Sequence, residues 1–248
     1  MADESSKIPE KTVEQIFDER YPLDKWEDSN YSILDKFSMR GRKGFVTGAA
    51  GGLGRNAAAA LAQAGADVAL VDLPSQEDKL TELAKDMSER FGTNVIALTC
   101  DVTNVEQVAE LKTQLVEQLG TVDFAFLNAG VNVPGDDQDA TEEVWTRTIN
   151  INLNGTYRTG RIAHEIMREH DHGGSLIFTA SLSGHNANYM MGSPTPVNAY
   201  GATKAAIMEH SRYLAAALAK DGIRSNTISP GYVWSGIFNG RIDMPGHD

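Results

Sequence analysis

From residue 43 onward, short apolar runs alternate with longer segments whose apolar residues recur at spacings of three and four. The short runs are typical of buried strands, and the longer segments are typical of helices that cover a sheet. Strands are predicted at residues 44–47, 67–72, 94–100, 124–128, 175–180 and 225–228. Helices are predicted at residues 54–64, 79–91, 105–119, 142–169 and 199–219, each followed by a glycine of the kind that commonly ends a helix: Gly65, Gly92, Gly120, Gly173 and Gly222. This alternation predicts an α/β fold with a doubly wound parallel sheet.

The first part of the chain, residues 1–40, shows no sustained hydrophobic period. It combines prolines and many charges with scattered aromatic side chains. We interpret residues 1–40 as an N-terminal extension and residues 41–248 as the folded domain. Because so many aromatic residues are unusual in a purely solvated tail, two readings stay open: a loose tail, or a segment that packs on the domain or on a neighbouring subunit.

The composition is that of an ordinary globular protein, since 41% of the 248 residues are hydrophobic and 23% are charged. The formal net charge of -12 disfavours binding to nucleic acid and to anionic membrane surfaces. Cys100 is the single cysteine, so we expect no internal disulfide and no metal site. The N-terminus lacks a signal-peptide pattern, and no apolar stretch approaches the roughly 20 residues that span a bilayer. We therefore expect a cytoplasmic protein with no membrane partner.

A glycine-rich turn, Thr47-Gly-Ala-Ala-Gly-Gly-Leu-Gly54, follows the first predicted strand. Glycines at such a turn let a pyrophosphate approach the backbone beside the positive end of the next helix. Asp72 ends the second predicted strand, where a carboxylate can bind both ribose hydroxyls of an adenosine and repel a 2′-phosphate. The turn and the carboxylate together predict NAD rather than NADP. Two alternatives remain: Asp72 could cap a turn before Pro74, and Arg55 could offset its charge.

Tyr200 and Lys204 lie one turn apart on a predicted helix and therefore project from the same face. An ammonium close to a phenol favours the phenolate and lowers the pKa of the tyrosine. A shift of about three units, helped by a cationic nicotinamide, would let Tyr200 exchange a proton near neutral pH. Taken alone, the pair could also be an ordinary tyrosine and lysine on a helix surface. The glycine turn upstream and a serine at the end of a preceding strand favour the catalytic interpretation.

Further motifs follow the glycine turn in a fixed order along the chain: Asp101-Val102, Asn128-Ala-Gly130, Asn152-Leu-Asn-Gly155, Ser181, Tyr200-Gly-Ala-Thr-Lys204 and Pro230-Gly231. In this order the motifs resemble those of the short-chain dehydrogenase/reductase family over about residues 37–235. The resemblance implies a Rossmann-type sheet of strand order 3-2-1-4-5-6 in a single dinucleotide-binding catalytic domain. Relatives continue with one more helix and strand, so we expect the C-terminus of this chain to be truncated.

The resemblance also implies a catalytic set of Asn152, Ser181, Tyr200 and Lys204. Tyr200 would be the general acid/base, and Lys204 would bind the nicotinamide ribose and lower the pKa of the tyrosine. Ser181 would stabilise charge on the substrate oxygen, and Asn152 would hold a water that links Lys204 to solvent. Rivals remain for two of these roles: Ser183 for the serine, and Asn150 and Asn154 for the asparagine.

The cofactor contacts implied by the resemblance extend over the ends of several strands: Gly48, Gly52, Leu53, Gly54, Asp72, Leu73, Asp101, Val102, Asn128, Ala129, Gly130, Tyr200, Lys204, Pro230, Gly231, Val233 and Ser235. Asp101 and Val102 would meet the adenine, Asn128–Gly130 the adenosine ribose, and residues 230–235 the nicotinamide. Plain alternatives are a helix cap at Asp101 and a bare turn at Asn128–Gly130.

Within the family, the chain resembles the branch that oxidises sugar alcohols or reduces ketoses, such as mannitol, arabinitol, sorbose and xylulose enzymes. Ser183, His185 and Tyr232 would supply hydroxyl-binding groups for such a substrate, next to a loop over residues 185–197 that is longer than in most relatives. Alternative substrates are hydroxysteroids or other small ketones, and an alternative function is a non-catalytic NAD-binding regulatory protein. Relatives commonly form tetramers or dimers, so we expect a homo-oligomer.

Overall fold

The computed structural model describes residues 36–132, 141–170, 172–187, 199–233 and 235. The chain divides into two units, residues 1–38 and 39–248, and the fold described below is that of the second. The expected extension at residues 1–40 and the end of the chain, residues 236–248, fall almost wholly outside the described part. Most of the long loop, residues 188–198, falls outside it as well.

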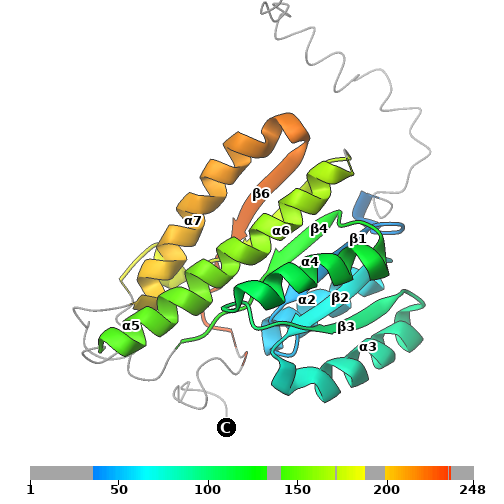
Figure 1. Cartoon of the computed structure of the whole chain (residues 1–248), viewed down its shortest axis with the longest axis horizontal. Helices are drawn as coiled ribbons and strands as arrows, with labels where there is room; N and C mark the ends of the chain where they lie inside the picture. The colour runs from blue at the N-terminus through cyan, green and yellow to red at the C-terminus, as the bar shows by residue number, and fades with distance from the viewer. Residues whose placement is uncertain (1–35, 133–140, 171, 188–198, 234, 236–248) are drawn as a thin grey trace, which may run out of the picture. The chain divides into compact units, whose positions relative to one another are not determined.

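The described strands form one parallel sheet: β1 (Lys43–Thr47), β2 (Asp67–Asp72), β3 (Val95–Thr99), β4 (Phe124–Leu127), β5 (Gly174–Thr179) and β6 (Ile223–Ile228). Their order is β3-β2-β1-β4-β5-β6 (Figure 1). The predicted α/β class and the order 3-2-1-4-5-6 are therefore confirmed. The order reverses at β1, which pairs with β2 on one side and with β4 on the other, so a crevice opens at the carboxyl ends of these strands.

Helices cover both faces of the sheet: α2 (Gly52–Gln63), α3 (Glu77–Phe91), α4 (Val105–Leu119), α5 (Glu142–Ile149), α6 (Thr156–Glu169) and α7 (Ala199–Leu218). In Figure 1, α4, α6 and α7 lie in front of the sheet. Successive strand residues point to opposite faces, so Phe45 belongs to the core under α4, α6 and α7, and Val46 to the core under α2 and α3. At the predicted stop Gly92, φ is 69°, and this left-handed residue caps α3.

One predicted helix differs in the structure. Residues 142–169 were expected to form a continuous α-helix, but a π-helical segment at Asn150–Gly155 separates α5 from α6. A π turn widens the helix by hydrogen bonding to the fifth residue instead of the fourth, and such turns are common at functional sites. Here the wide turn holds Asn152 inside the protein, where its exposed fraction is 0%. A Cβ on Gly155 would lie 2.5 Å from a Val102 methyl group, so the backbone of this turn packs directly on the segment after β3.

Candidate active site

A cleft of about 820 Å³ runs along the carboxyl ends of the strands. The segments that follow all six strands of the sheet contribute to its lining. Most of the predicted site residues line it: Gly48, Gly52, Leu53, Asp72, Leu73, Asp101, Val102, Asn128, Ala129, Gly130, Ser181, Ser183, Tyr200, Lys204, Pro230, Gly231, Tyr232, Val233 and Ser235. Of the predicted residues, Gly54, Asn152 and His185 lie outside the lining.

The glycine turn brings β1 into α2 at one end of the cleft. Gly48 has a φ of 67°, which side chains larger than hydrogen disfavour. A Cβ on Gly54 would collide with the Gly48 carbonyl oxygen, so the turn can close only around glycine. Helix α2 begins after Gly51 with neither a side-chain cap nor an acidic residue in its first turn. A bare helix N-terminus of this kind fits an anionic pyrophosphate, because its N–H groups and its dipole both favour negative charge.

Asp72 lies beside this turn. One carboxylate oxygen accepts a hydrogen bond from the Ala50 N–H at 2.9 Å and the other from the Leu73 N–H at 2.8 Å. The carboxylate is therefore tied to the glycine turn, and its remaining lone pairs can accept ribose hydroxyls. Arg55, the alternative partner for its charge, is exposed and is not among the residues that line the cleft.

Asn128, which is expected beside the adenosine ribose, lines the cleft, and its side chain also bonds to neighbouring strand ends. Its amide donates to the carbonyl oxygens of Thr47 at 3.2 Å and Gly48 at 3.4 Å, and its oxygen accepts from the Thr179 hydroxyl at 3.3 Å. The Thr47 hydroxyl in turn accepts the N–H groups of Asn128 and Ala129, each at 3.0 Å. These bonds hold together the ends of β1, β4 and β5. The sequence motif contained Thr47, but nothing in it indicated that the hydroxyl organises the site.

Asp101 supports a local turn as well as lining the cleft. One of its carboxylate oxygens accepts hydrogen bonds from both the backbone N–H and the hydroxyl of Thr103, at 2.9 and 2.8 Å. The helix that follows is capped by Asn104, which accepts a hydrogen bond from the Gln107 N–H at 3.0 Å. The alternative that Asp101 is the helix cap is therefore wrong, because Asn104 occupies the N-cap position.

Lys204 is buried at the floor of the cleft, with an exposed fraction of 3%. Its ammonium donates a hydrogen bond to the Thr179 carbonyl oxygen at 2.7 Å and lies 5.5 Å from the centroid of the Tyr200 ring. Burial lowers the pKa of Lys204 from 10.5 to about 8. The ammonium is thus positioned on the same side of α7 as the phenol, as their spacing predicted.

The pKa of Tyr200 moves in the direction opposite to the expectation. Burial raises the pKa of Tyr200 above its ordinary value, while a hydrogen bond from the Ser181 hydroxyl lowers it. Desolvation is the larger effect because it penalises the charged phenolate, and the ammonium faces the ring and the Thr179 carbonyl. In the structure, burial therefore favours the uncharged phenol of Tyr200.

Ser181 follows β5 and is held between two strand ends. The Ala180 N–H donates to Ile228 at 2.8 Å and the Leu182 N–H donates to Pro230 at 3.0 Å. Its hydroxyl accepts the Ser183 N–H at 3.2 Å, and Ser181 thereby caps the short helix η6 (Leu182–Gly184). Ser181 also hydrogen-bonds Tyr200, whereas the rival Ser183 lines the cleft and donates its backbone N–H to Ser181.

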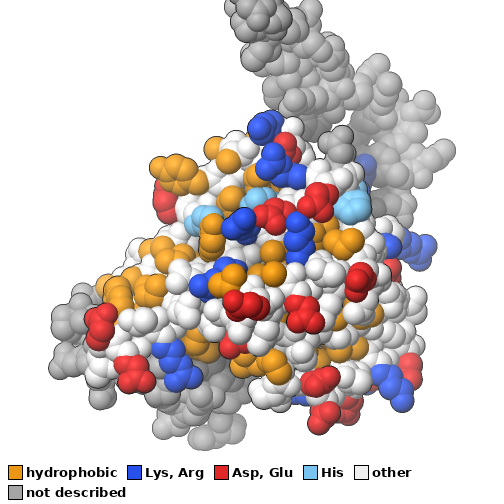
Figure 2. All heavy atoms as spheres, viewed as in Figure 1, with side chains coloured by type: hydrophobic (Ala, Val, Ile, Leu, Met, Phe, Trp, Pro, Cys, Tyr) orange, Lys and Arg blue, Asp and Glu red, His pale blue; other side chains and the backbone are white. Residues whose placement is uncertain are grey.

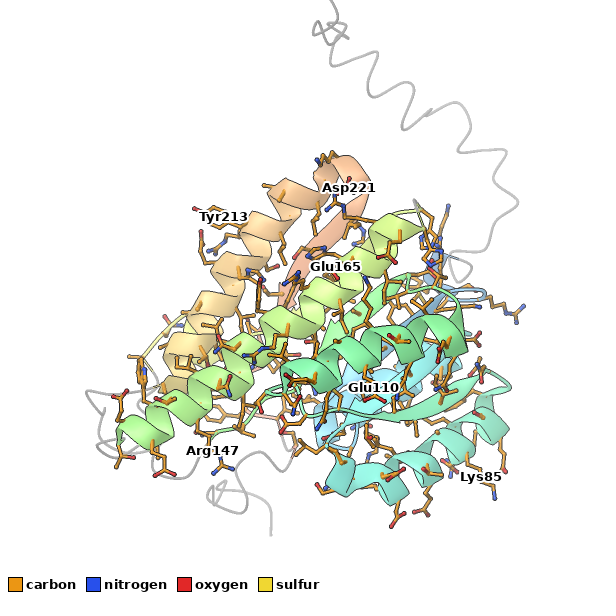
Figure 3. The ribbon with its side chains drawn as sticks, viewed as in Figure 1. Lys85, Glu110, Arg147, Glu165, Tyr213 and Asp221 are labelled. Carbon is orange, nitrogen blue, oxygen red and sulfur yellow. The ribbon has the colours of Figure 1, made fainter. Side chains whose placement is uncertain are left out.

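Of two residues expected at the substrate end, one lies in the cleft and the other does not. Tyr232 lines the cleft, but His185 is exposed and its Nε2 is 2.9 Å from the Ser229 hydroxyl oxygen. Two cations that sequence reasoning missed also line the cleft: Lys79 of α3, and Arg147, which Figure 3 labels on α5. No motif marks them, because their positions depend on how the helices fold over the strand ends. Within the described residues, no group of three or more His, Cys, Asp or Glu is placed to hold a metal ion.

These features define the class of protein. A parallel sheet of this order, with a glycine turn beside a bare helix N-terminus, defines a dinucleotide-binding α/β protein. A family model described as enoyl-(acyl carrier protein) reductase matches residues 48–245. The chain belongs to the short-chain dehydrogenase/reductase family, whose members are oxidoreductases that bind a nicotinamide cofactor.

Several relatives are polyol or ketose enzymes. Sorbose reductase sou1 of Schizosaccharomyces pombe is 39% identical over 203 residues, which cover 81% of this chain and 76% of the relative. An NADP-dependent mannitol dehydrogenase of Alternaria alternata is 36% identical over 83% of this chain and 75% of its own length. A short-chain dehydrogenase/reductase of Mycobacterium marinum superposes with a TM-score of 0.77 at 34% identity, over 84% of this chain and 79% of that structure. The predicted resemblance to polyol and ketose enzymes is confirmed.

Proposed function

We propose that this protein is an NAD-dependent dehydrogenase/reductase that interconverts a sugar alcohol and the corresponding ketose. The observation that carries the proposal is the meeting of Ser181, Tyr200 and Lys204 in the cleft that the glycine turn and Asp72 also line. A phenol, a hydroxyl and an ammonium at one end of a dinucleotide-sized cleft are the groups that a secondary alcohol needs in order to lose a proton and a hydride.

The roles of the side chains follow from their contacts. Tyr200 takes the hydroxyl proton of the alcohol, or returns it to the ketone, at its phenol oxygen. Ser181, which in the structure donates its hydroxyl proton to Tyr200, turns that proton toward the substrate oxygen and stabilises charge that develops there. Lys204 is fixed by Thr179 and binds the nicotinamide ribose. The bound nicotinamide supplies the carbon that exchanges the hydride and, when oxidised, the positive charge that favours the phenolate.

The choice of NAD rests on Asp72. Its carboxylate, held by Ala50 and Leu73, presents negative charge where a 2′-phosphate would have to lie. The mannitol dehydrogenase relative is NADP-dependent, so the preference proposed here differs from that relative. Lys79 at the same cleft is the observation that favours NADP instead, since its ammonium could pair with a phosphate.

The preference for NAD over NADP can be measured as the ratio of kcat/KM with NAD to kcat/KM with NADP. We expect Asp72→Ala to lower this ratio by at least tenfold, because the variant loses the ribose contacts and the repulsion together. Asp78→Ala is the matched control, since Asp78 is exposed on the same helix as Lys79 and outside the cleft lining. Equal losses with both cofactors in Asp72→Ala would remove the argument for NAD.

The proposed activity is tested by following NADH absorbance with the full-length protein against a panel of polyols and ketoses. We expect turnover with at least one polyol, and a loss of kcat of roughly 10²- to 10⁴-fold in Tyr200→Phe with NADH affinity nearly unchanged. Turnover confined to steroids or other small ketones would move the substrate to another class. A protein that binds NADH and turns over nothing would instead be a non-catalytic NAD-binding protein.

We further propose that residues 41–248 form the catalytic domain of a cytoplasmic homo-oligomer, a tetramer or a dimer. The exposed aromatic side chains Tyr157 on α6 and Tyr213 on α7, 47% and 71% exposed, support an interface on this face. Figure 2 shows hydrophobic side chains among charges of both signs on the face formed by α4, α6 and α7. Among the helices of the described part, none has the length and apolar composition of a membrane span. Light scattering of the purified protein would measure the oligomeric state.

A further inference from the structure

Thr203 precedes Lys204 on α7, and its hydroxyl lies inside the protein with an exposed fraction of 0%. The hydroxyl donates its proton to the Tyr200 carbonyl oxygen at 2.7 Å. It therefore offers a lone pair to its other neighbour, the Asn152 side-chain amide, whose nitrogen donates to it at 3.3 Å. The helix that carries the phenol and the ammonium is thus bonded directly to the π turn that carries Asn152.

The Asn152 carboxamide has a second set of partners on the segment after β4. Its nitrogen donates to the Val131 carbonyl oxygen at 2.9 Å, and its oxygen accepts the Val131 N–H at 2.8 Å. The bonds to Thr203 and Val131 use both N–H groups of the carboxamide and one lone pair of its oxygen. The carboxamide thereby joins three segments of the chain and keeps one oxygen lone pair for a further donor.

The Asn152 side-chain oxygen, which keeps this lone pair, borders the same space as the Lys204 nitrogen. A Cβ built on Gly130 would lie 3.2 Å from the Asn152 side-chain oxygen and 3.5 Å from the Lys204 nitrogen. Both atoms therefore flank the same small space, which the absent side chain of Gly130 leaves open. Gly130 also lines the cleft, so this space is next to the catalytic groups.

We propose that Thr203 is a positioning residue that acts through Asn152: it anchors the carboxamide to α7 and keeps its oxygen directed at the space shared with Lys204. This rests on the proposed function, in which Lys204 supports proton exchange by Tyr200. Without the Thr203 lone pair, one buried N–H of Asn152 loses its acceptor, and an unsatisfied buried group drives the side chain to reorient. The Asn152 oxygen then leaves its place beside Lys204.

The test compares Thr203→Val, which has nearly the same shape but no hydroxyl, with Thr203→Ser, which keeps the hydroxyl. Thr159→Val is the matched control, because Thr159 is equally buried and its hydroxyl bonds only to carbonyls in and next to its own helix, those of Gly155 and Thr156. We expect kcat to fall roughly tenfold in Thr203→Val with the KM for NAD unchanged, and Thr203→Ser and Thr159→Val to keep most of the wild-type kcat. Wild-type kcat in Thr203→Val, equal losses in Thr203→Val and Thr159→Val, or no rescue by serine would each overturn the proposal.

A second measurement does not depend on turnover. Because the Val131 N–H is bonded to Asn152, release of the carboxamide should speed hydrogen exchange at the Val131 amide at least tenfold in Thr203→Val, and in neither Thr203→Ser nor Thr159→Val. If exchange at Val131 is faster in Thr203→Val but the wild-type protein shows no activity, Thr203 positions Asn152 and the proposed function is wrong. Unchanged exchange at Val131 would reject the positioning role even in an active enzyme.

Discussion

Lys204→Met replaces a buried ammonium by an uncharged side chain of similar length. The wild-type side chain is 3% exposed, and its charge is compensated by one carbonyl bond, to Thr179. Holding a cation in such a place costs folding free energy, because water solvates the ammonium better in the unfolded chain. The cost must depend on pH, since the lysine escapes it by losing its proton.

The sign follows from the two pKa values of Lys204. The unfolded value is 10.5 and the folded value is about 8, so between these pH values the unfolded chain holds a proton that the folded protein has released. The free energy of unfolding therefore rises with pH across this window, by about 3 kcal/mol in total, and the gain is lost as pH falls through 8. Cys100 acts in the opposite direction above pH 9, because burial raises its pKa from 9.0 to about 12. The contribution of Lys204 is therefore measured best between pH 8 and 9, where it raises the free energy of unfolding by about 1 kcal/mol.

Urea unfolding at several pH values between 7 and 9 measures this slope. We expect the wild-type free energy of unfolding to rise with pH. Between pH 8 and 9, the rise should be about 1 kcal/mol smaller in Lys204→Met. The unsatisfied Thr179 carbonyl in the variant costs about the same at each pH and cancels from the slope. Exposed Lys220 provides the control, since Lys220→Met should keep the wild-type slope. Parallel curves for wild type and Lys204→Met would refute the buried-cation argument.

Two further predictions concern one glycine of the turn beside the cleft and one glycine that lines the cleft. Gly54→Ala places a methyl group against the Gly48 carbonyl and should abolish NADH binding and destabilise the fold by about 2 kcal/mol or more, measured by NADH fluorescence and urea unfolding. Gly231→Ala, whose added carbon meets no protein atom within 4 Å, should leave the free energy of unfolding unchanged, and equal destabilisation at both positions would contradict the argument for a turn that closes only around glycine. Gly130→Ala fills the space beside the Lys204 nitrogen and should lower kcat roughly fivefold or more at saturating NADH; an unchanged kcat would show that this space is not needed.

The strands and helices could be predicted because each is marked by an apolar pattern within its own residues. The strand Asp67–Asp72 and the helix Val105–Leu119 have the bounds that their apolar patterns predicted. Among the strands, the predicted start differs most at β6, which begins at Ile223 instead of residue 225. This strand lies at the edge of the sheet, and its exposed and buried residues alternate at its start, so no continuous apolar run marks it.

The cleft was predictable in part, for the same reason. The glycine turn and Asp72 carry their chemistry within a few residues, and the structure brings them together. The π turn and the carboxamide bonds of Asn152 depend on Val131 and Thr203, which are far away in the sequence, and no periodic pattern encodes such partners. His185 shows the converse: its residue type suited the substrate site, but its side chain bonds Ser229 outside the cleft lining.

The end of β5 shows how a buried cation is held, within the described part of the chain, by a carbonyl. The Thr179 carbonyl accepts the Lys204 ammonium, while the Thr179 hydroxyl points to Asn128 and so to the glycine turn. Side chains alternate along a strand, so Ser181, two residues on, lies on the same side as Thr179 and reaches Tyr200. A carboxylate beside Lys204 would pair with the ammonium, whereas a carbonyl satisfies one of its N–H groups and leaves its charge uncompensated. The reduced stability argued for Lys204 is therefore a consequence of holding that charge in a buried place beside a neutral acceptor.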